Sequence, residues 1–282
     1  MTHASASRTL LSHPIAFIGG GNMARSLIGG LVKRGADPSR IRVAEPVEAL
    51  RAALAADFGV QVFADAGEAA YGADTWLFAV KPQAMRQACE SLAAKAQSQR
   101  PLVVSIAAGI TTAQLRRWLG DDLPVVRSMP NTPALLGAGV TGLFASPEVD
   151  DAGRQRAESL LASAGPTVWI DAETKMDAVT GVSGSGPAYV FLLAEAMEAA
   201  AKAEGLPDDS ARTLVLQTVL GAARMLTETG EAPAELRRRV TSPNGTTQAA
   251  IETFQAGGFE TLVAQAVHAA TVRGGELSAA ND

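Results

Sequence analysis

The chain has 282 residues, of which 47% are hydrophobic and 19% are charged, and its formal net charge is −5. This composition excludes a disordered chain, a collagen and a coiled coil, and the length suits roughly two domains of ~150 residues each. We expect no nucleic-acid partner, because phosphate binding needs clustered lysine and arginine, and the chain has one short basic run, at residues 237–239.

The chain offers few residues for metal or covalent chemistry. Cys89 is the single cysteine, which excludes an intrachain disulfide and a multi-thiolate metal site and favours the reducing cytoplasm. Of the three histidines, only His268 lies inside the patterned sequence, so neither a Ser-His-Asp triad nor a multi-histidine metal site is expected. We therefore expect no metal, and chemistry that depends on carboxylates, hydroxyls, lysines, backbone amides or a bound cofactor.

No segment predicts secretion or membrane insertion. Residues 1–12 lack the apolar core of a signal peptide, and we expect them to form a disordered tail. The most apolar later stretch, residues 189–203, is interrupted by Glu195, Glu198 and Lys202, whose charges are costly inside a bilayer. We expect a cytoplasmic protein without membrane contacts.

Residues 13–171 alternate short apolar runs with helical patterns, which is typical of βαβ units around a parallel sheet buried on both faces. Strands are predicted at 15–18, 41–44, 75–80, 102–106, 125–126, 140–144 and 167–170. Helices are predicted at 22–34, 46–58, 83–96 and 111–119. The pattern indicates an α/β domain with a doubly wound parallel sheet.

Residues 172–282 lose the strand pattern and become rich in alanine. Helices are predicted at 187–204, 208–229, 233–240, 246–255 and 259–273. Small residues on more than one helix face favour close packing against a second copy, so we predict an all-α dimerisation domain. The alternative is an ordinary monomeric helical bundle.

A glycine-rich turn follows the first predicted strand and opens a helix. Residues 19–24 read Gly-Gly-Gly-Asn-Met-Ala, a G-x-G-x-x-A form of the dinucleotide fingerprint. Gly19 permits the tight turn, Gly21 allows the backbone to approach a pyrophosphate, and Ala24 keeps the helix close to the strand. The motif alone is weak, since a glycine turn can lack function. Its place after the first strand favours dinucleotide binding by a Rossmann-type domain.

Glu45 ends the second predicted strand, where an acid accepts hydrogen bonds from the adenosine ribose of NAD and repels a 2′-phosphate. Arg42 or Arg51 could offset that repulsion, so the sequence leaves NADH against NADPH open. The alternative for Glu45 is a solvated loop acid.

Two further strand ends predict cofactor contacts. Lys81 and Pro82 place a cation and a rigid turn after one strand, and small residues at 107–109 leave room for a nicotinamide after the next. An ordinary surface lysine is the alternative for Lys81. Residues 127–133, with polar groups between two prolines, predict the floor of a site.

Two Gly/Ser elbows, at residues 183–187 and 242–247, interrupt the helical segment. Each is expected to open a new helix, whose unpaired backbone N–H groups and partial positive charge suit a small carboxylate. The alternative is that these elbows are only helix caps and hinges.

Four motifs resemble the pyrroline-5-carboxylate reductase family, in the family's order, within residues 15–277. They are Val-Lys-Pro-Gln at 80–83, Arg-Ser-Met-Pro-Asn-Thr-Pro at 127–133, Asp-Ala-Val-Thr-Gly-Val-Ser-Gly-Ser-Gly-Pro-Ala-Tyr at 177–189 and Val-Thr-Ser-Pro-Asn-Gly-Thr-Thr at 240–247. The resemblance implies reduction of L-1-pyrroline-5-carboxylate to L-proline, the last step of proline synthesis, by hydride transfer from NADPH or NADH. It also implies a Rossmann domain followed by a helical domain that interleaves in a homodimer, with dimers sometimes assembled into decamers.

The resemblance also assigns site residues. Thr247 is the implied catalytic residue, whose hydroxyl reaches the ring nitrogen of the substrate. The implied substrate contacts are Glu173, Gly245, Thr246 and Thr247. With Glu45, the cofactor contacts are Gly19, Gly20, Gly21, Asn22, Met23, Ala24, Ala79, Val80, Lys81, Pro82, Ser105, Ile106 and Ala107. Family members often carry Gly where this chain has Asn244, and Asn where it has Ala66.

Two other functions are compatible with the predicted domain plan. A β-hydroxyacid dehydrogenase shares this domain plan but uses a lysine of the helical domain as acid and base, for which Lys175 and Lys202 are the candidates. A regulatory nucleotide-binding protein could keep the fold without the reaction.

Overall fold

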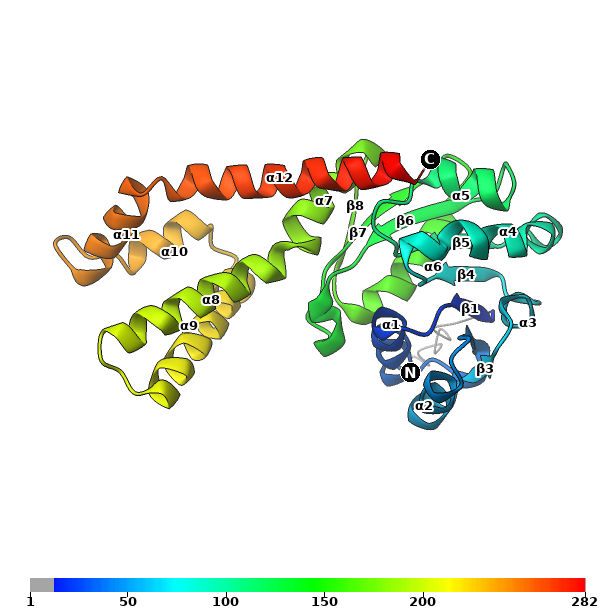
Figure 1. Ribbon diagram of the computed structural model, residues 1–282, viewed down its shortest axis with the longest axis horizontal. Coiled ribbons are helices and arrows are strands. Elements are labelled where there is room, and N and C mark those ends of the chain that lie inside the picture. The colour runs from blue at the N-terminus through cyan, green and yellow to red at the C-terminus, as the bar shows by residue number, and fades with distance from the viewer. Residues whose placement is uncertain (1–12, 282) are drawn as a thin grey trace, which may run out of the picture. The chain divides into compact units, whose positions relative to one another are not determined.

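The computed structural model describes residues 13–281 (Figure 1), so the predicted tail lies outside the described residues. The described residues form two compact units. The sheet unit runs up to Ser185 and also includes the residues from Ala269 onward, and the helical unit is Gly186–His268. The sequence analysis placed the division at 171 and gave the whole carboxyl-terminal segment to the helical domain, whereas the last turns of the final helix belong to the sheet unit.

The sheet unit contains one sheet of eight strands in the order β3-β2-β1-β4-β5-β6-β7-β8. The strands are β1 Ile15–Ile18, β2 Ile41–Ala44, β3 Gln61–Phe63, β4 Thr75–Phe78, β5 Leu102–Ser105, β6 Val125–Met129, β7 Thr141–Ala145 and β8 Thr167–Trp169. This is the predicted doubly wound topology, with the chain crossing from the β3 edge back to β4 beside β1.

The sequence analysis predicted a parallel sheet, but one strand pair is antiparallel. β7 pairs antiparallel with β6, and β8 pairs parallel with β7. Between β6 and β7 the chain forms only the short 3-10 helix Thr132–Leu136. A parallel return needs a longer crossover, usually with an α-helix, so the short connection imposes the antiparallel return.

Helices cover both faces of the sheet. They are α1 Asn22–Lys33, α2 Glu48–Phe58, α3 Ala66–Ala70, α4 Pro82–Gln99, α5 Thr112–Leu119, α6 Asp151–Leu161 and α7 Met176–Val179. Successive β1 side chains enter opposite cores: Phe17 packs with Leu27 of α1 on one face, and Ile18 packs with Met85 of α4 on the other. Burial on both faces explains why β1 and β4 read as continuous apolar runs.

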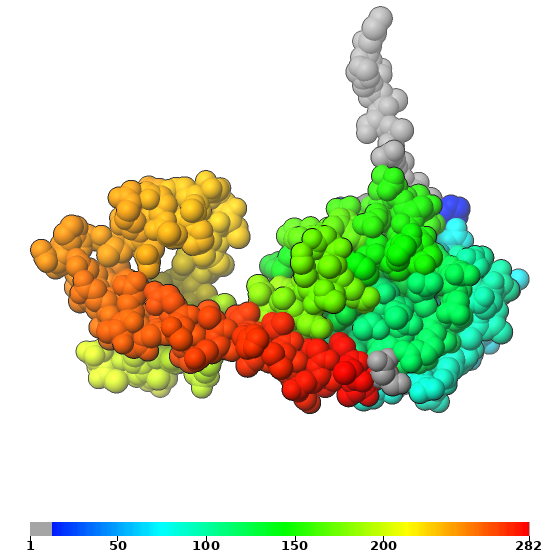
Figure 2. Space-filling model, turned by 90° about the horizontal axis from the view of Figure 1, so that it is seen from above, coloured from blue at the N-terminus to red at the C-terminus, as the bar shows by residue number. Residues whose placement is uncertain are grey.

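The helical unit exposes much of its apolar surface. Its helices are α8 Gly186–Ala203, α9 Asp208–Glu228, α10 Pro233–Arg239, α11 Thr246–Ala256 and α12 Phe259–Ala280, of which α12 continues into the sheet unit. Phe191 and Leu192 of α8 and Leu262 of α12 are each more than 60% exposed. In Figure 2 the yellow and orange helices of this unit stand apart around a hollow. Such apolar exposure indicates a surface that a second protein covers.

Within residues 13–281, no helix combines the length and the apolar character needed to cross a membrane.

Candidate active site

The glycine-rich turn between β1 and α1 has the geometry of an anion cradle. Gly19 has φ +105°, and a Cβ there would lie 2.7 Å from the Ala79 carbonyl oxygen. Open space surrounds Gly21, where an added Cβ meets nothing within 4 Å. The first helical hydrogen bond is Arg25 N to Gly21 O, so the amides of residues 22–24 have no partner within the helix. Unpaired amides at the start of a twelve-residue helix attract a phosphate.

Glu45 does not extend into solvent, because its side chain turns back toward this cradle and only 7% of the residue is exposed. Its two carboxylate oxygens accept hydrogen bonds from Gly20 N at 3.1 Å and Val47 N at 2.9 Å. Arg51 donates to the Glu45 and Pro46 carbonyls at 2.7 Å each. The carboxylate is therefore a fixed negative charge at the end of β2, and this geometry argues against a solvated loop acid.

The predicted cofactor residues meet at one edge of the sheet. The strand ends are joined by hydrogen bonds from Ala79 N to Ile18 O at 2.8 Å and from Ile106 N to Phe78 O at 3.2 Å. Residues 19–24 and 79–82 thus follow β1 and β4, and residues 105–107 include the last residue of the neighbouring β5 and the two residues after it. Carboxyl ends of parallel strands are where open α/β sheets bind ligands.

Lys81 and Ser105 occupy different environments at this edge. Lys81 is exposed and precedes Pro82, the first residue of α4. Ser105 is fully buried, and its hydroxyl accepts a hydrogen bond from Ala107 N at 3.3 Å. The Ser105 carbonyl accepts from the Ser128 hydroxyl at 2.8 Å. The start of the loop after β5 is therefore anchored, while the exposed Lys81 side chain can extend toward a ligand.

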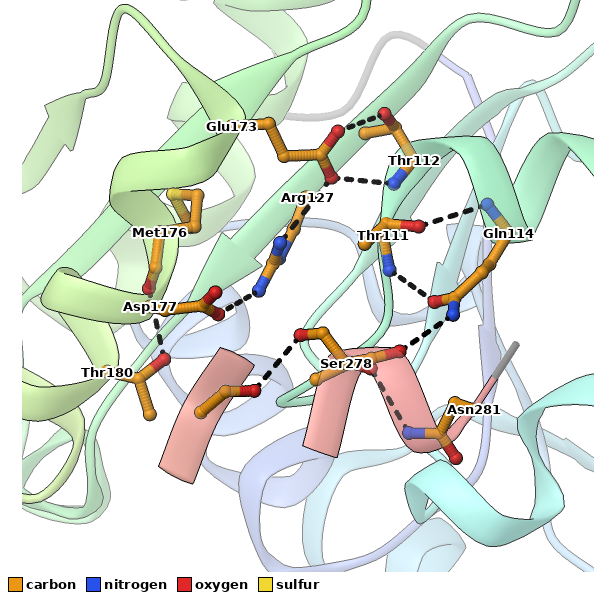
Figure 3. Close-up of polar contacts among 12 residues, drawn as sticks. Thr111, Thr112, Gln114, Arg127, Glu173, Met176, Asp177, Thr180, Ser278 and Asn281 are labelled. Atoms are coloured by element: carbon orange, nitrogen blue, oxygen red, sulfur yellow. Dashed lines mark hydrogen bonds and ion pairs between the residues drawn. The ribbon is translucent and has the colours of Figure 1, made fainter. Parts of the chain in front are cut away.

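Glu173 lies in a polar cluster of the sheet unit (Figure 3). One of its oxygens accepts from Thr112 N and the other from the Thr112 hydroxyl, both at 2.7 Å. Arg127, which is 5% exposed at its side chain, lies 3.5 Å from Glu173 and 3.0 Å from Asp177. Both Glu173 oxygens thus have protein partners, a network that the sequence analysis did not foresee because it joins residues up to 61 positions apart.

The first elbow leads into a new helix, α8, as expected, but the backbone before it is already helical. Residues Thr180–Gly184 form a π-helical turn that leads into α8, and Ser185 N donates to Thr180 O at 2.8 Å. Asn131, between β6 and the following 3-10 helix, donates to the Ser183 carbonyl at 3.1 Å. Because the backbone is already helical before α8 and Ser185 N is occupied, this elbow is less open to a carboxylate than the N-terminus of a separate helix.

The second elbow, in the helical unit, is a tight turn that opens α11. Gly245 N donates to the Ser242 carbonyl at 3.1 Å, and Asn244 has φ +59°. Pro followed by a residue of positive φ is the pattern of a type II turn, and asparagine tolerates that conformation. Gln248 accepts from Asn244 N at 2.7 Å.

Among the described residues, the first helical hydrogen bond of α11 is Ala249 N to Gly245 O, so the amides of residues 246–248, including those of Thr246 and Thr247, remain open. Gly245 caps α11 without a side-chain hydrogen bond, and its own amide is occupied by Ser242. A Cβ on Gly245 would lie 2.5 Å from the Ser242 hydroxyl, so this hydroxyl lies beside Gly245 in the turn. The sequence analysis did not name Ser242 as a site residue. Among the described residues the Thr247 hydroxyl makes no hydrogen bond.

The two lysines that a hydroxyacid dehydrogenase would need are both paired with carboxylates. Lys175 lies 2.8 Å from Asp171. Lys202 lies 3.1 Å from Glu198, and this hydrogen bond raises the pKa of Lys202 above its usual value. A lysine with a raised pKa is a poor base near neutral pH.

The comparisons with known proteins agree with this geometry. The family model described as pyrroline-5-carboxylate reductase dimerisation matches residues 173–277, and that described as NADP oxidoreductase coenzyme F420-dependent matches residues 14–109. A pyrroline-5-carboxylate reductase of Pseudomonas aeruginosa is 52% identical over 94% of this chain and 96% of that protein. The chain belongs to the pyrroline-5-carboxylate reductase family.

Solved reductases also share the fold. The Coxiella burnetii enzyme has a TM-score of 0.92 and 41% identity, covering 95% of this chain and 99% of that chain. The Plasmodium falciparum enzyme, solved with NADP bound, has a TM-score of 0.83 and 25% identity, covering 95% and 98% respectively. Membership of the reductase family confirms the resemblance, the NAD(P)H-dependent oxidoreductase class and the combination of a Rossmann-like domain with a helical dimerisation domain. The dimerisation domain indicates a homo-oligomer.

Proposed function

We propose that this member of the reductase family reduces L-1-pyrroline-5-carboxylate to L-proline at the second elbow. The observation that carries the proposal is the start of α11, where the open amides of Thr246 and Thr247 lie beside the Thr247 hydroxyl, which has no partner among the described residues. A helix N-terminus suits the substrate carboxylate. The hydroxyl suits the ring nitrogen, so one turn of chain can bind both polar ends of a small cyclic imino acid.

The sheet edge fits a nicotinamide dinucleotide. The open amides of residues 22–24 and the space at Gly21 suit the pyrophosphate, and Glu45 suits the adenosine ribose. Lys81 and the loop after β5, residues 105–107, would hold the remainder of the molecule. The bound cofactor supplies the hydride. Its form is NADPH or NADH, and the buried Glu45 carboxylate favours NADH, because it repels a 2′-phosphate and occupies the Gly20 and Val47 amides.

The residues of the elbow have distinct proposed roles. The amides of Thr246 and Thr247 bind the carboxylate, and Gly245 leaves the Ser242 hydroxyl uncovered by a side chain. The Thr247 hydroxyl hydrogen-bonds the ring nitrogen and orients the C=N bond. The imine nitrogen takes up a proton from water and the imine carbon gains the hydride, so C=N becomes CH–NH. Catalysis therefore needs orientation and one polar partner rather than a nucleophile.

Glu173 acts indirectly in this proposal. Its carboxylate holds Thr112 and Arg127, so we assign it to supporting the start of α5.

Variants of Thr247 test the proposed site. Thr247→Ala and Thr247→Val remove the hydroxyl, and Thr247→Ser retains it. We expect kcat for imine reduction to fall about 10- to 100-fold in the first two, the range for a lost hydrogen bond to a charged group, and to stay within about threefold of wild type in Thr247→Ser. Wild-type turnover and imine affinity in both Thr247→Ala and Thr247→Val would refute the role.

We further propose that the assembly is built from dimers through the helical unit, either as a dimer or as a larger set such as a decamer. We also propose that it works in the cytoplasm, with no nucleic-acid or membrane partner. The single buried cysteine and the acidic net charge support this setting.

A further inference from the structure

The end of α12 packs against the loop between β5 and α5, although the two segments are distant in the sequence (Figure 3). Asn281 donates from Nδ2 to the Gly109 carbonyl at 3.1 Å, across 172 positions. A Cβ on Gly109, where φ is +70°, would lie 3.3 Å from the Leu277 Cβ. Gly109 thus allows the loop to lie directly on the helix.

A buried glutamine forms a second link between the same segments. Gln114 is 1% exposed, and its side-chain carbonyl accepts from Thr111 N at 2.8 Å. Its amide donates to the Ser278 carbonyl at 3.0 Å. Gln114 also completes the capping box of α5 with Thr111, so the helix start and the α12 carbonyl are fixed by one side chain.

Two glycines of α12 provide a third link. A Cβ on Gly274 would lie 3.4 Å from the Asp177 Cβ, and one on Gly275 would lie 3.7 Å from an Asp177 carboxylate oxygen. Asp177 in turn holds Arg127 at 3.0 Å. Gly274 and Ser278 are four residues apart, so their contacts lie along one face of α12, and Asn281 follows directly after its last residue, Ala280.

We propose that the carboxyl-terminal turns of α12 position the nicotinamide-side loop, residues 105–109, with Asn281 as the positioning residue. The first half of this loop is held at the sheet by the hydrogen bonds of Ser105 with Ala107 and Ser128. Its second half bends at Gly109, where Asn281 fixes the carbonyl. This role rests on the proposed function, in which residues 105–107 contact the cofactor.

Two substitutions test the hydrogen bond. Asn281→Ala removes the side chain beyond Cβ, and Asn281→Asp keeps its shape but removes the N–H donor. We expect both to raise the Kd for NADH and for NADPH about 3- to 10-fold, the range for one lost hydrogen bond. The imine KM at saturating cofactor should stay within about twofold of wild type, since a general loss of structure would not separate the two ligands. The matched control is Glu276→Ala on the same helix, whose exposed side chain pairs only with Arg273 among the described residues, and which should bind cofactor like wild type.

Binding is measured by nicotinamide fluorescence without imine, and turnover is measured separately. Unchanged Kd values for both cofactors in Asn281→Ala and Asn281→Asp would overturn the positioning role. If the variants bind cofactor weakly but wild-type protein fails to reduce pyrroline-5-carboxylate, the proposed function fails and the positioning role stands. If wild-type protein reduces the imine and the variants bind cofactor normally, only the positioning role fails.

Discussion

Replacing Arg127 should destabilise the sheet unit more than replacing any exposed arginine. Its guanidinium lies between the Glu173 and Asp177 carboxylates, at 3.5 and 3.0 Å, and its side chain is only 5% exposed. Arg127→Met keeps an apolar stem of similar length but leaves two carboxylates facing each other. The Glu173 carboxylate cannot easily turn away, because Thr112 holds both of its oxygens.

The magnitude follows from the exposure of the three groups. Breaking a fully buried ion pair by removing one partner costs about 3–5 kcal/mol. Glu173 and Asp177 are 23% and 20% exposed, so water screens part of the repulsion. We therefore expect a loss near the lower limit, about 3 kcal/mol. Arg127→Met with Asp177→Asn should recover part of that loss, because one of the two facing charges is removed.

Urea unfolding followed by tryptophan fluorescence measures this effect. Trp76, Trp118 and Trp169 all lie in the sheet unit, so the signal reports that unit. Protomer concentration must be fixed, since a homo-oligomer gains stability with concentration. The control Arg86→Met, in α4 of the same unit, removes an exposed pair with Glu90 and should cost less than ~1 kcal/mol. If Arg127→Met cost no more than Arg86→Met, burial would not set the cost.

Three further perturbations test the cofactor edge and the core. Glu45→Ser should raise the ratio of kcat/KM for NADPH to kcat/KM for NADH by about tenfold or more, which corresponds to ~1.4 kcal/mol, because it removes a charge and releases two amides. An unchanged ratio in parallel absorbance assays would contradict this. Gly19→Ala should abolish measurable cofactor binding by fluorescence, since its Cβ would lie 2.7 Å from the Ala79 carbonyl at φ +105°, and normal binding would refute the turn's role. Burial raises the pKa of Cys89 from 9.0 to about 12, so the folded thiol stays protonated at pH 8 and should react with a thiol reagent only on unfolding. Because the folded protein holds the thiol proton more tightly than the unfolded chain, Cys89 contributes free energy of unfolding that is fully present below pH 9 and is lost as pH rises toward 12. Rapid labelling of the folded protein, or no loss of stability over that pH range, would contradict this account of Cys89.

Local patterns were sufficient to predict most of the sheet. β1 and β4 are buried on both faces, so their apolar runs were plain in the sequence. The edge strand β3 has three residues and an exposed first position, which leaves too little pattern to detect. Helix α6 was missed although Asp150 caps it and Ala157 and Leu160 are buried one turn apart, a signal that was present in the sequence.

The candidate site was predictable in position but not in its contacts. The glycine-rich turn and the α11 elbow follow from residue types that permit close approach and positive φ. The direction of the Glu45 side chain depends on where the Gly20 and Val47 amides lie, and periodicity carries no information about that. The Glu173 partners and the Gly109–Asn281 bond join distant segments, so they emerge only from the tertiary fold.

The most direct test of the function is oxidation of NADH and NADPH by purified protein with L-1-pyrroline-5-carboxylate, while proline is quantified in the same reaction. We predict that one proline is formed for each reduced nicotinamide oxidised. Little oxidation is expected when the imine is replaced by an oxo acid, the class of product that a β-hydroxyacid dehydrogenase forms. Cofactor binding without imine-dependent oxidation, or oxidation without proline, would contradict it.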